Sequence, residues 1–289
     1  MGPQYRCDVT PVNIHRRARV WLQFNCALFP EVSGGPEYVP WADLLAAIER
    51  WRAEQRLRLF FFVRKPPGLR LRFSGKDLDD RLLPRLVAWL DEAERRNAIR
   101  SYRLAYYEPE QARFGGAMGM QIAHAAFDRD SRHVMRYAGL STEAQRAIPP
   151  CAFSLLLVNH LLGSYIRDTA ELWDIWQRLS RVVGGVRAVR ATAADEIAVA
   201  LAAISDRDAV MARLPPDAAR LLRDAWQDNA EIIARLHAAE QTARLQIGPR
   251  GWLATLCLFH WNRLALEQGD LGEMIDTMLR LFTLPERDA

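Results

Sequence analysis

The order of strand and helix patterns in the N-terminal part of the chain constrains the fold most strongly. Four segments have the alternating or continuous apolar pattern of β-strands: 19–28, 57–64, 68–74 and 99–107. Two segments have the spacing of amphipathic helices: 41–55 and 78–97. The resulting order, β-α-β-β-α-β, is typical of a ferredoxin-like unit, whose two helices pack on the same face of its sheet. The other face then needs a cover from elsewhere in the chain.

The remainder of the chain is predicted to be almost entirely helical. Seven segments have apolar residues at three- and four-residue spacing: 117–127, 153–166, 170–183, 193–203, 216–236, 253–266 and 271–282. Clusters of glycine and proline separate most of them. We therefore predict an α+β protein in which a ferredoxin-like portion, 1–116, packs against a mostly helical portion, 117–289. The two portions are expected to form one functional unit.

Composition narrows the range of functions. The formal net charge is only +4 over 289 residues and is spread along the chain, which does not suggest nucleic-acid binding. No apolar run approaches the roughly 20 residues that span a bilayer, and the N-terminus lacks a signal-peptide pattern, so a cytoplasmic protein without a membrane partner is expected. The four scattered cysteines, and the absence of nucleotide, haem and flavin motifs, predict no metal and no cofactor.

A pair of arginines lies in the segment GLRLRF. Period two places Leu69, Leu71 and Phe73 on one face of the strand and Arg70 and Arg72 on the other. The apolar three should meet the two helices, so the arginines should face the helical portion. Arginines on an exposed sheet face can serve solubility alone. However, the preceding strand is apolar on both faces, which favours a covered surface, and a covered guanidinium needs an anionic partner.

A second group of candidates lies in the segment YYEPEQARFGG, just past the last predicted strand. Glu110 and Arg113 are three residues apart, and Gly115 and Gly116 lead into a helix. A glycine turn before a helix can present backbone N–H groups and the positive end of the helix dipole to an anion. A surface ion pair between Glu110 and Arg113 on a flexible loop is the alternative interpretation.

His260 is the third candidate. On a helix it falls on the stripe formed by Leu253, Leu256, Cys257 and Leu264, which points its ring inward. A single histidine on an apolar stripe is commonly a core residue. Its unperturbed pKa near 6.5 nevertheless makes it the best candidate in this chain for moving protons at neutral pH.

Six motifs in this order resemble the elimination domain of lantibiotic dehydratases, which also occurs in free-standing thiopeptide-type bacteriocin biosynthesis proteins. The motifs are the N-terminal strand around Trp21, FFFVRKPPGLRLRF, YEPEQARFGG, FDRDS, DTAELWDIW and FHWNRL, and the likeness spans nearly the whole chain. The resemblance implies a lyase that works with a separate glutamylation protein. That partner uses glutamyl-tRNA to esterify serine or threonine of a ribosomally made precursor peptide with a leader. The lyase then removes the α-proton and expels glutamate, leaving dehydroalanine or dehydrobutyrine.

The resemblance also implies roles for individual residues. Arg70, Arg72 and Arg113 would hold the glutamyl group and stabilise its departing charge. His260 would transfer a proton, and Glu110 would orient an arginine or share the proton transfer. The implied partners are the precursor peptide and the glutamylation protein, with no direct nucleic-acid contact. The donors that would stabilise the backbone enolate are not identified by the sequence.

The chain departs from the family pattern at two positions. Gly68 stands where relatives often have histidine, and His124 stands where they often have an acidic residue.

Two functions other than glutamate elimination are alternatives. The predicted fold resembles that of thiopeptide pyridine synthases, which join two dehydroalanines by a formal [4+2] cycloaddition with loss of the leader peptide. Presence of all five site residues favours elimination. A non-catalytic docking subunit is the third hypothesis, although it would not need inward arginines and histidine.

Overall fold

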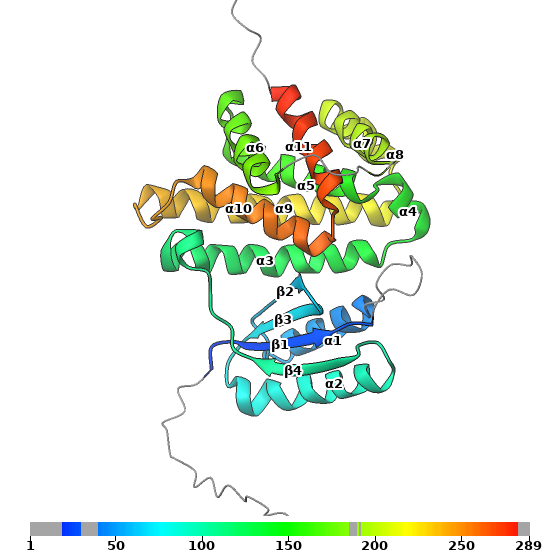
Figure 1. Cartoon of the computed structure of the whole chain (residues 1–289), viewed down its shortest axis with the longest axis vertical. Coiled ribbons are helices and arrows are strands. Elements are labelled where there is room, and N and C mark those ends of the chain that lie inside the picture. Colours follow the sequence, from blue (N-terminus) through cyan, green and yellow to red (C-terminus); the bar gives the residue numbers. More distant parts are fainter. Residues whose placement is uncertain (1–18, 30–39, 185–189, 191, 283–289) are drawn as a thin grey trace, which may run out of the picture.

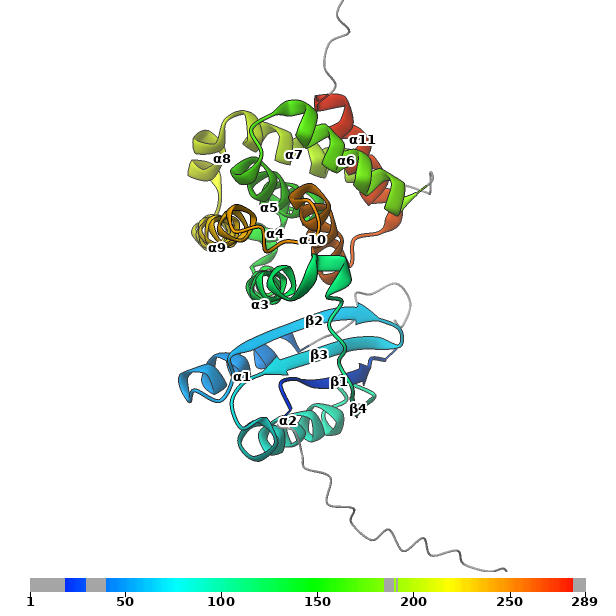
Figure 2. The same cartoon turned by 90° about the vertical axis from the view of Figure 1, so that its left-hand side faces the viewer.

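The chain folds into a sheet layer below a helical layer (Figure 1). The computed structural model describes residues 19–29, 40–184, 190 and 192–282. Its first part contains one four-stranded antiparallel sheet and its second part is helical, so the predicted α+β class is confirmed. The helix α3 (Gly116–Ala138) is the part of the helical layer that lies next to the sheet in both views (Figures 1 and 2).

The sheet contains the four predicted strands: β1 (Leu22–Ala27), β2 (Leu59–Lys65), β3 (Gly68–Ser74) and β4 (Ser101–Ala105). The order in space is β2-β3-β1-β4, and every pairing is antiparallel. Two helices lie between strands in sequence: α1 (Trp41–Ala53) and α2 (Leu83–Arg95). The segment predicted as one helix over 78–97 begins with a separate turn, Leu78–Leu82, and α2 has a proline in its first turn, where the missing N–H costs least.

The two faces of the sheet belong to different cores. Leu69, Leu71 and Phe73 of β3 are buried in one cluster with apolar residues of α1 and α2, which confirms the prediction for this face. Phe61 and Val63 of β2 belong to the other cluster, that of the helical layer. Arg70 is in register with Val63, and Arg72 with Phe61, so the arginines share the face that is turned toward the helical layer.

The helical layer contains two helices that the periodicity did not predict. Its helices after α3 are α4 (Thr142–Ala147), α5 (Pro150–Tyr165), α6 (Thr169–Val183), α7 (Ala193–Ser205), α8 (Arg207–Arg213), α9 (Pro216–Gln241), α10 (Pro249–Leu264) and α11 (Gln268–Phe282). The helices α4 and α8 are too short for a repeat to be read. The helix α5 is apolar nearly all round and lies in the middle of the layer.

The helix α3 is longer than predicted because its polar second half is buried against other elements. β2 is an edge strand, and side chains from the helical layer bind its free backbone groups. Asp128 and Ser131 of α3 accept hydrogen bonds from the N–H groups of Phe60 (2.7 Å) and Phe62 (3.3 Å). The edge is therefore closed, and this contact sets the position of the helical layer on the sheet.

The helix α10 continues the same edge closure. Asn262 accepts a hydrogen bond from the Arg64 N–H (2.8 Å) and donates one to the Arg64 carbonyl (2.9 Å). Arg263 donates through Nε to the Phe62 carbonyl (3.0 Å). Side chains of the motifs FDRDS and FHWNRL thus take the place of a fifth strand.

We expect Asp128→Ala to lower the free energy of unfolding by about 2–4 kcal/mol. Asp128 is 4 % exposed and also pairs with Arg52 of α1, so its removal leaves a buried N–H and a guanidinium without a partner. Urea denaturation measures the loss. The matched control is Asp224→Ala, which breaks a more exposed ion pair with Arg136 and should cost less than about 1 kcal/mol. Equal losses in the two variants would contradict this account.

Candidate active site

Arg72 is a largely buried guanidinium that packs against two neighbouring aromatic rings. Its Cζ lies 5.1 Å from the ring centroid of Phe61 and 4.3 Å from that of Tyr107. Its Nε donates to Oε1 of Gln23 (2.7 Å). Burial lowers the pKa of Arg72 to about 10, and the neighbouring charge of Arg70 adds to this effect. In the described part of the chain no carboxylate forms an ion pair with Arg72, so the site is suited to an external anion.

Glu110 and Arg113 form the surface ion pair that was the alternative interpretation of their motif. Arg113 Nη1 lies 3.0 Å from Glu110 Oε2, and the side chains are 51 % and 45 % exposed. Glu110 is also within electrostatic reach of Arg72 and favours its charged form. The structure therefore brings Arg70, Arg72 and Glu110 to one region, with Arg113 attached through Glu110.

The glycine pair before α3 has a packing role. Gly115 and Gly116 have φ angles of +70° and +90°, which residues with a Cβ rarely adopt. A Cβ at Gly115 would lie 2.8 Å from Ile247, and one at Gly116 would lie 2.8 Å from Gln246. Both backbone N–H groups bind carbonyls of the preceding turn. The N–H groups of these two glycines are therefore not free to bind an anion.

Tyr107 and His124 form a buried hydrogen-bonded pair beside Arg72. The Tyr107 hydroxyl lies 2.8 Å from His124 Nε2. The His124 ring packs on Trp21, with centroids 4.6 Å apart. Burial, with a smaller contribution from Arg72, lowers the pKa of His124 to about 4, so its ring is neutral at pH 7. Burial raises the pKa of Tyr107 to about 12, although Arg72 opposes the shift.

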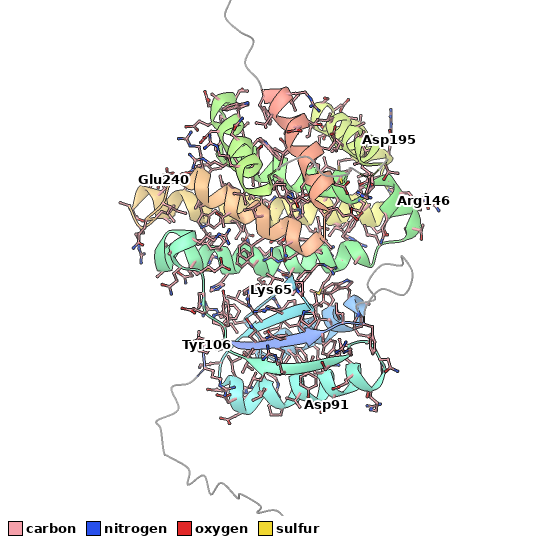
Figure 3. All side chains as sticks on the ribbon, viewed as in Figure 1. Lys65, Asp91, Tyr106, Arg146, Asp195 and Glu240 are labelled. Carbon is pink, nitrogen blue, oxygen red and sulfur yellow. The ribbon has the colours of Figure 1, made fainter. Side chains whose placement is uncertain are left out.

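An open groove with a volume of about 980 Å³ adjoins this pair. It lies between one end of the sheet and the first half of α3, and Tyr107 and His124 form part of its wall. Tyr106, labelled in Figure 3, also lines the groove and is 87 % exposed. A ligand in the groove can therefore reach the Tyr107–His124 pair, whose tyrosine ring is stacked on Arg72.

His260 lies in a different cavity. Its Nδ1 is 2.7 Å from Asp130 Oδ1, the ring is buried, and its Nε2 has no hydrogen-bond partner among the residues that the structure describes. The cavity, about 40 Å³ in volume, lies within the helical layer and is also lined by His133 and Asp228. None of the arginines assigned to the glutamyl group lines it.

Arg263 connects the two regions. Its Nη1 lies 2.8 Å from Asp130 Oδ2, and its charge acts on both Arg72 and Tyr107. Burial alone would raise the pKa of Asp130, but His260 and Arg263 outweigh it and hold that pKa well below its usual range. The His260–Asp130–Arg263 network is thus an electrostatic neighbour of the Arg72 site.

Sequence reasoning assigned no role to several residues of this region. Asp130 and Arg263 stand inside the motifs FDRDS and FHWNRL, which is the signal that could have identified them. Tyr107 stands inside YYEPEQARFGG, and His124 attracted notice only as a departure from the family. Nothing in the sequence indicates that Tyr107 and His124 meet, because the contact joins the end of the sheet to a helix.

The described residues contain neither a metal-binding cluster nor a membrane-spanning helix. No group of three or more histidine, cysteine, aspartate or glutamate side chains is placed to hold a metal ion. No helix in the described ranges is long and apolar enough to cross a membrane.

Burial raises the pKa of the Cys26 and Cys257 thiols to about 12, so both are protonated at neutral pH.

Comparison with known proteins shows the family to which this chain belongs. The family described as lantibiotic biosynthesis dehydratase C-term matches residues 42–280. The chain belongs to this family, which confirms the resemblance seen in the sequence. No curated protein matches the chain significantly.

Two solved structures are similar to this chain. The first is the tRNA-dependent lantibiotic dehydratase MibB from Microbispora sp. 107891, with 18% identity and a TM-score of 0.63. The match covers 94% of this chain but only 29% of MibB, so the chain spans under a third of that protein and the likeness shows the fold. The second is TsrL, with 14% identity, a TM-score of 0.48 and coverage of 91% of this chain and 93% of TsrL.

The lowered pKa of His124 predicts a specific loss of stability in acid. An unfolded histidine takes up a proton near pH 6.5, whereas His124 in the fold does so only near pH 4. The unfolded state therefore binds more protons in this window, and stability falls as the pH falls through it. The expected cost at pH 5, relative to pH 8, is about 2 kcal/mol. Urea denaturation of wild type and His124→Gln at both pH values should show a correspondingly smaller acid loss in the variant; equal losses would contradict the assignment.

Proposed function

We propose that this protein is a lyase that removes glutamate from glutamylated serine and threonine residues of a ribosomally made peptide. The products are dehydroalanine and dehydrobutyrine. One observation carries the proposal: the Arg72 guanidinium packs against the rings of Phe61 and Tyr107, and no carboxylate of the described residues forms an ion pair with it. Membership of the lantibiotic dehydratase family supports the same reaction type.

The chemistry of the leaving group suits this site. Glutamate departs as a carboxylate, and a guanidinium binds a carboxylate through two parallel hydrogen bonds. Because Arg72 is largely buried, its attraction for an anion is screened less than it would be in water. Arg70 adds a second cation on the same sheet face. The like charges of Arg70 and Arg72 disfavour each other, and a shared anion relieves that repulsion.

Roles for the remaining predicted residues form part of the proposal. Arg113 contacts the glutamyl group at the exposed side of the site, and Glu110 orients Arg113. His260 carries a proton: Asp130 holds its Nδ1, which leaves Nε2 as the free nitrogen of an oriented imidazole. The residues 1–116 and 117–289 act as one unit.

The proposed partners are a precursor peptide with a leader and a separate protein that glutamylates it from glutamyl-tRNA. The outer edge of β4 has no neighbouring strand in the described sheet, and an extended leader can add to such an edge. The order β2-β3-β1-β4, with α1 and α2 packed on one face, supports a ferredoxin-like assignment for this layer.

Substitution of Arg72 tests the anion site. We expect Arg72→Gln to lower the rate of glutamate release from a synthetic peptide with one O-glutamyl serine by about 100-fold or more, because the departing charge loses its donor. Enzymatic glutamate detection and the mass of the peptide measure the product. The control is Arg95→Gln, which removes an exposed arginine of α2 and should leave release unchanged.

Wild-type protein that releases no glutamate would contradict the proposed function. The same protein is then incubated with a peptide that bears two dehydroalanines. Formation of an aromatic chromophore with release of the leader would support pyridine synthesis in place of elimination. Peptide binding without either product would support a docking subunit.

Substitution of His260 separates proton transfer from a structural role. We expect His260→Gln to lower glutamate release by about 100-fold or more, since the usual contribution of a general acid or base begins at about that value. Circular dichroism and thermal unfolding report whether the Asp130–Arg263 contact survives. A lower melting temperature with unchanged release per folded molecule would instead assign His260 to the scaffold of Asp130 and Arg263.

A further inference from the structure

Tyr107 and His124 form part of the groove wall. Tyr107 follows β4, and His124 lies in the first half of α3, so the pair joins the two layers at the groove wall. The aromatic rings of Trp21 and Phe61 pack edge-on against Tyr107, with centroids 5.4 Å and 5.7 Å away. This packing fixes the direction of the hydroxyl.

The hydrogen-bond capacity of the pair leaves one donor unused. Among residues that the structure places, His124 is the only hydrogen-bond partner of the Tyr107 hydroxyl. The direction of this hydrogen bond depends on the tautomer of His124. In the tautomer with the hydrogen on Nε2, the imidazole donates to the hydroxyl oxygen, and the hydroxyl hydrogen can be donated to a ligand. Burial keeps Tyr107 protonated, and the neighbouring Arg72 cation makes its hydroxyl a stronger donor.

Elimination requires a hydrogen-bond donor for the enolate oxygen close to the site that binds the departing carboxylate. When the base takes the α-proton, the electron pair moves into the adjacent carbonyl and forms an enolate. The enolate then collapses: its electron pair forms the Cα=Cβ double bond, the Cβ–O bond breaks, and glutamate leaves with the electron pair of the broken bond. The enolate oxygen and the departing oxygen are separated by only three carbon atoms. A donor beside Arg72 can therefore reach the enolate while Arg72 holds the leaving carboxylate.

We propose that Tyr107 is a catalytic residue that donates a hydrogen bond to the enolate oxygen, and that His124 is the positioning residue that orients its hydroxyl. This inference rests on the proposed function and deepens it. Arg72 and Tyr107 then divide the two developing negative charges between them. Tyr107 forms no covalent bond and undergoes no net change of protonation in the reaction.

Tyr107→Phe is the direct test, because it keeps the ring that stacks on Arg72 and removes only the hydroxyl. We expect kcat for glutamate release from the O-glutamyl serine peptide to fall by about 100-fold, as for loss of one oxyanion donor, while KM changes by less than about threefold. The matched control is Tyr102→Phe in β4, whose hydroxyl binds Asp91 on α2 and which should retain full activity.

The outcomes separate the two proposals. Full activity of Tyr107→Phe beside an active wild type would overturn this inference and leave the proposed function intact. An inactive wild type would overturn both. A fall in kcat with unchanged KM and an unchanged melting temperature would support the inference.

His124 variants keep the inference testable if Tyr107→Phe does not fold. His124→Gln retains an N–H donor for the Tyr107 oxygen, so kcat should stay within about fivefold of wild type. His124→Phe preserves aromatic packing without that donor, so kcat should fall by about tenfold or more. Equal activity of the two variants would overturn the positioning role of His124.

Discussion

The outer edge of β2 is closed by side chains where a fifth strand would otherwise pair. Asp128, Ser131 and Asn262 accept hydrogen bonds from alternate N–H groups of the strand, and Arg263 donates to one of its carbonyls. A buried backbone group without a partner costs more than an ordinary hydrogen bond contributes, so these contacts determine where the helical layer lies. The position of that layer in turn places α3 against the arginine-bearing face of the sheet.

This closure also separates two charged regions that share a boundary. On the groove side, Arg72 lies with Tyr107 and His124; inside the helical layer, Asp130 holds His260. Arg263 binds both the β2 edge and Asp130, and its charge acts on Arg72. A single buried guanidinium therefore contributes to the fold and to the electrostatics of the site. Substitution of Arg263 would disturb both, so Arg72, Tyr107 and His260 are the more informative positions.

Much of the fold could be predicted because its signals are local. The bounds of β3, Gly68–Ser74, coincide with the predicted strand, and period two correctly separates Leu71 from Arg72. The candidate site was predictable only in part. Arg70, Arg72 and Glu110 lie in one region, whereas the glycine turn is explained by packing on Gln246 and Ile247.

The sequence by itself determined the family, the order of the helices and strands, and the sheet face on which Arg70 and Arg72 lie. Short-range periodicity and motifs encode these features. Only the tertiary structure decided which polar groups meet. Two contacts are examples: Tyr107 with His124, and His260 with Asp130. Each contact joins two elements whose distance from one another is set by the packing of whole layers. Burial then set the pKa of His124 and Tyr107, because desolvation depends on every neighbour and not on the residue alone.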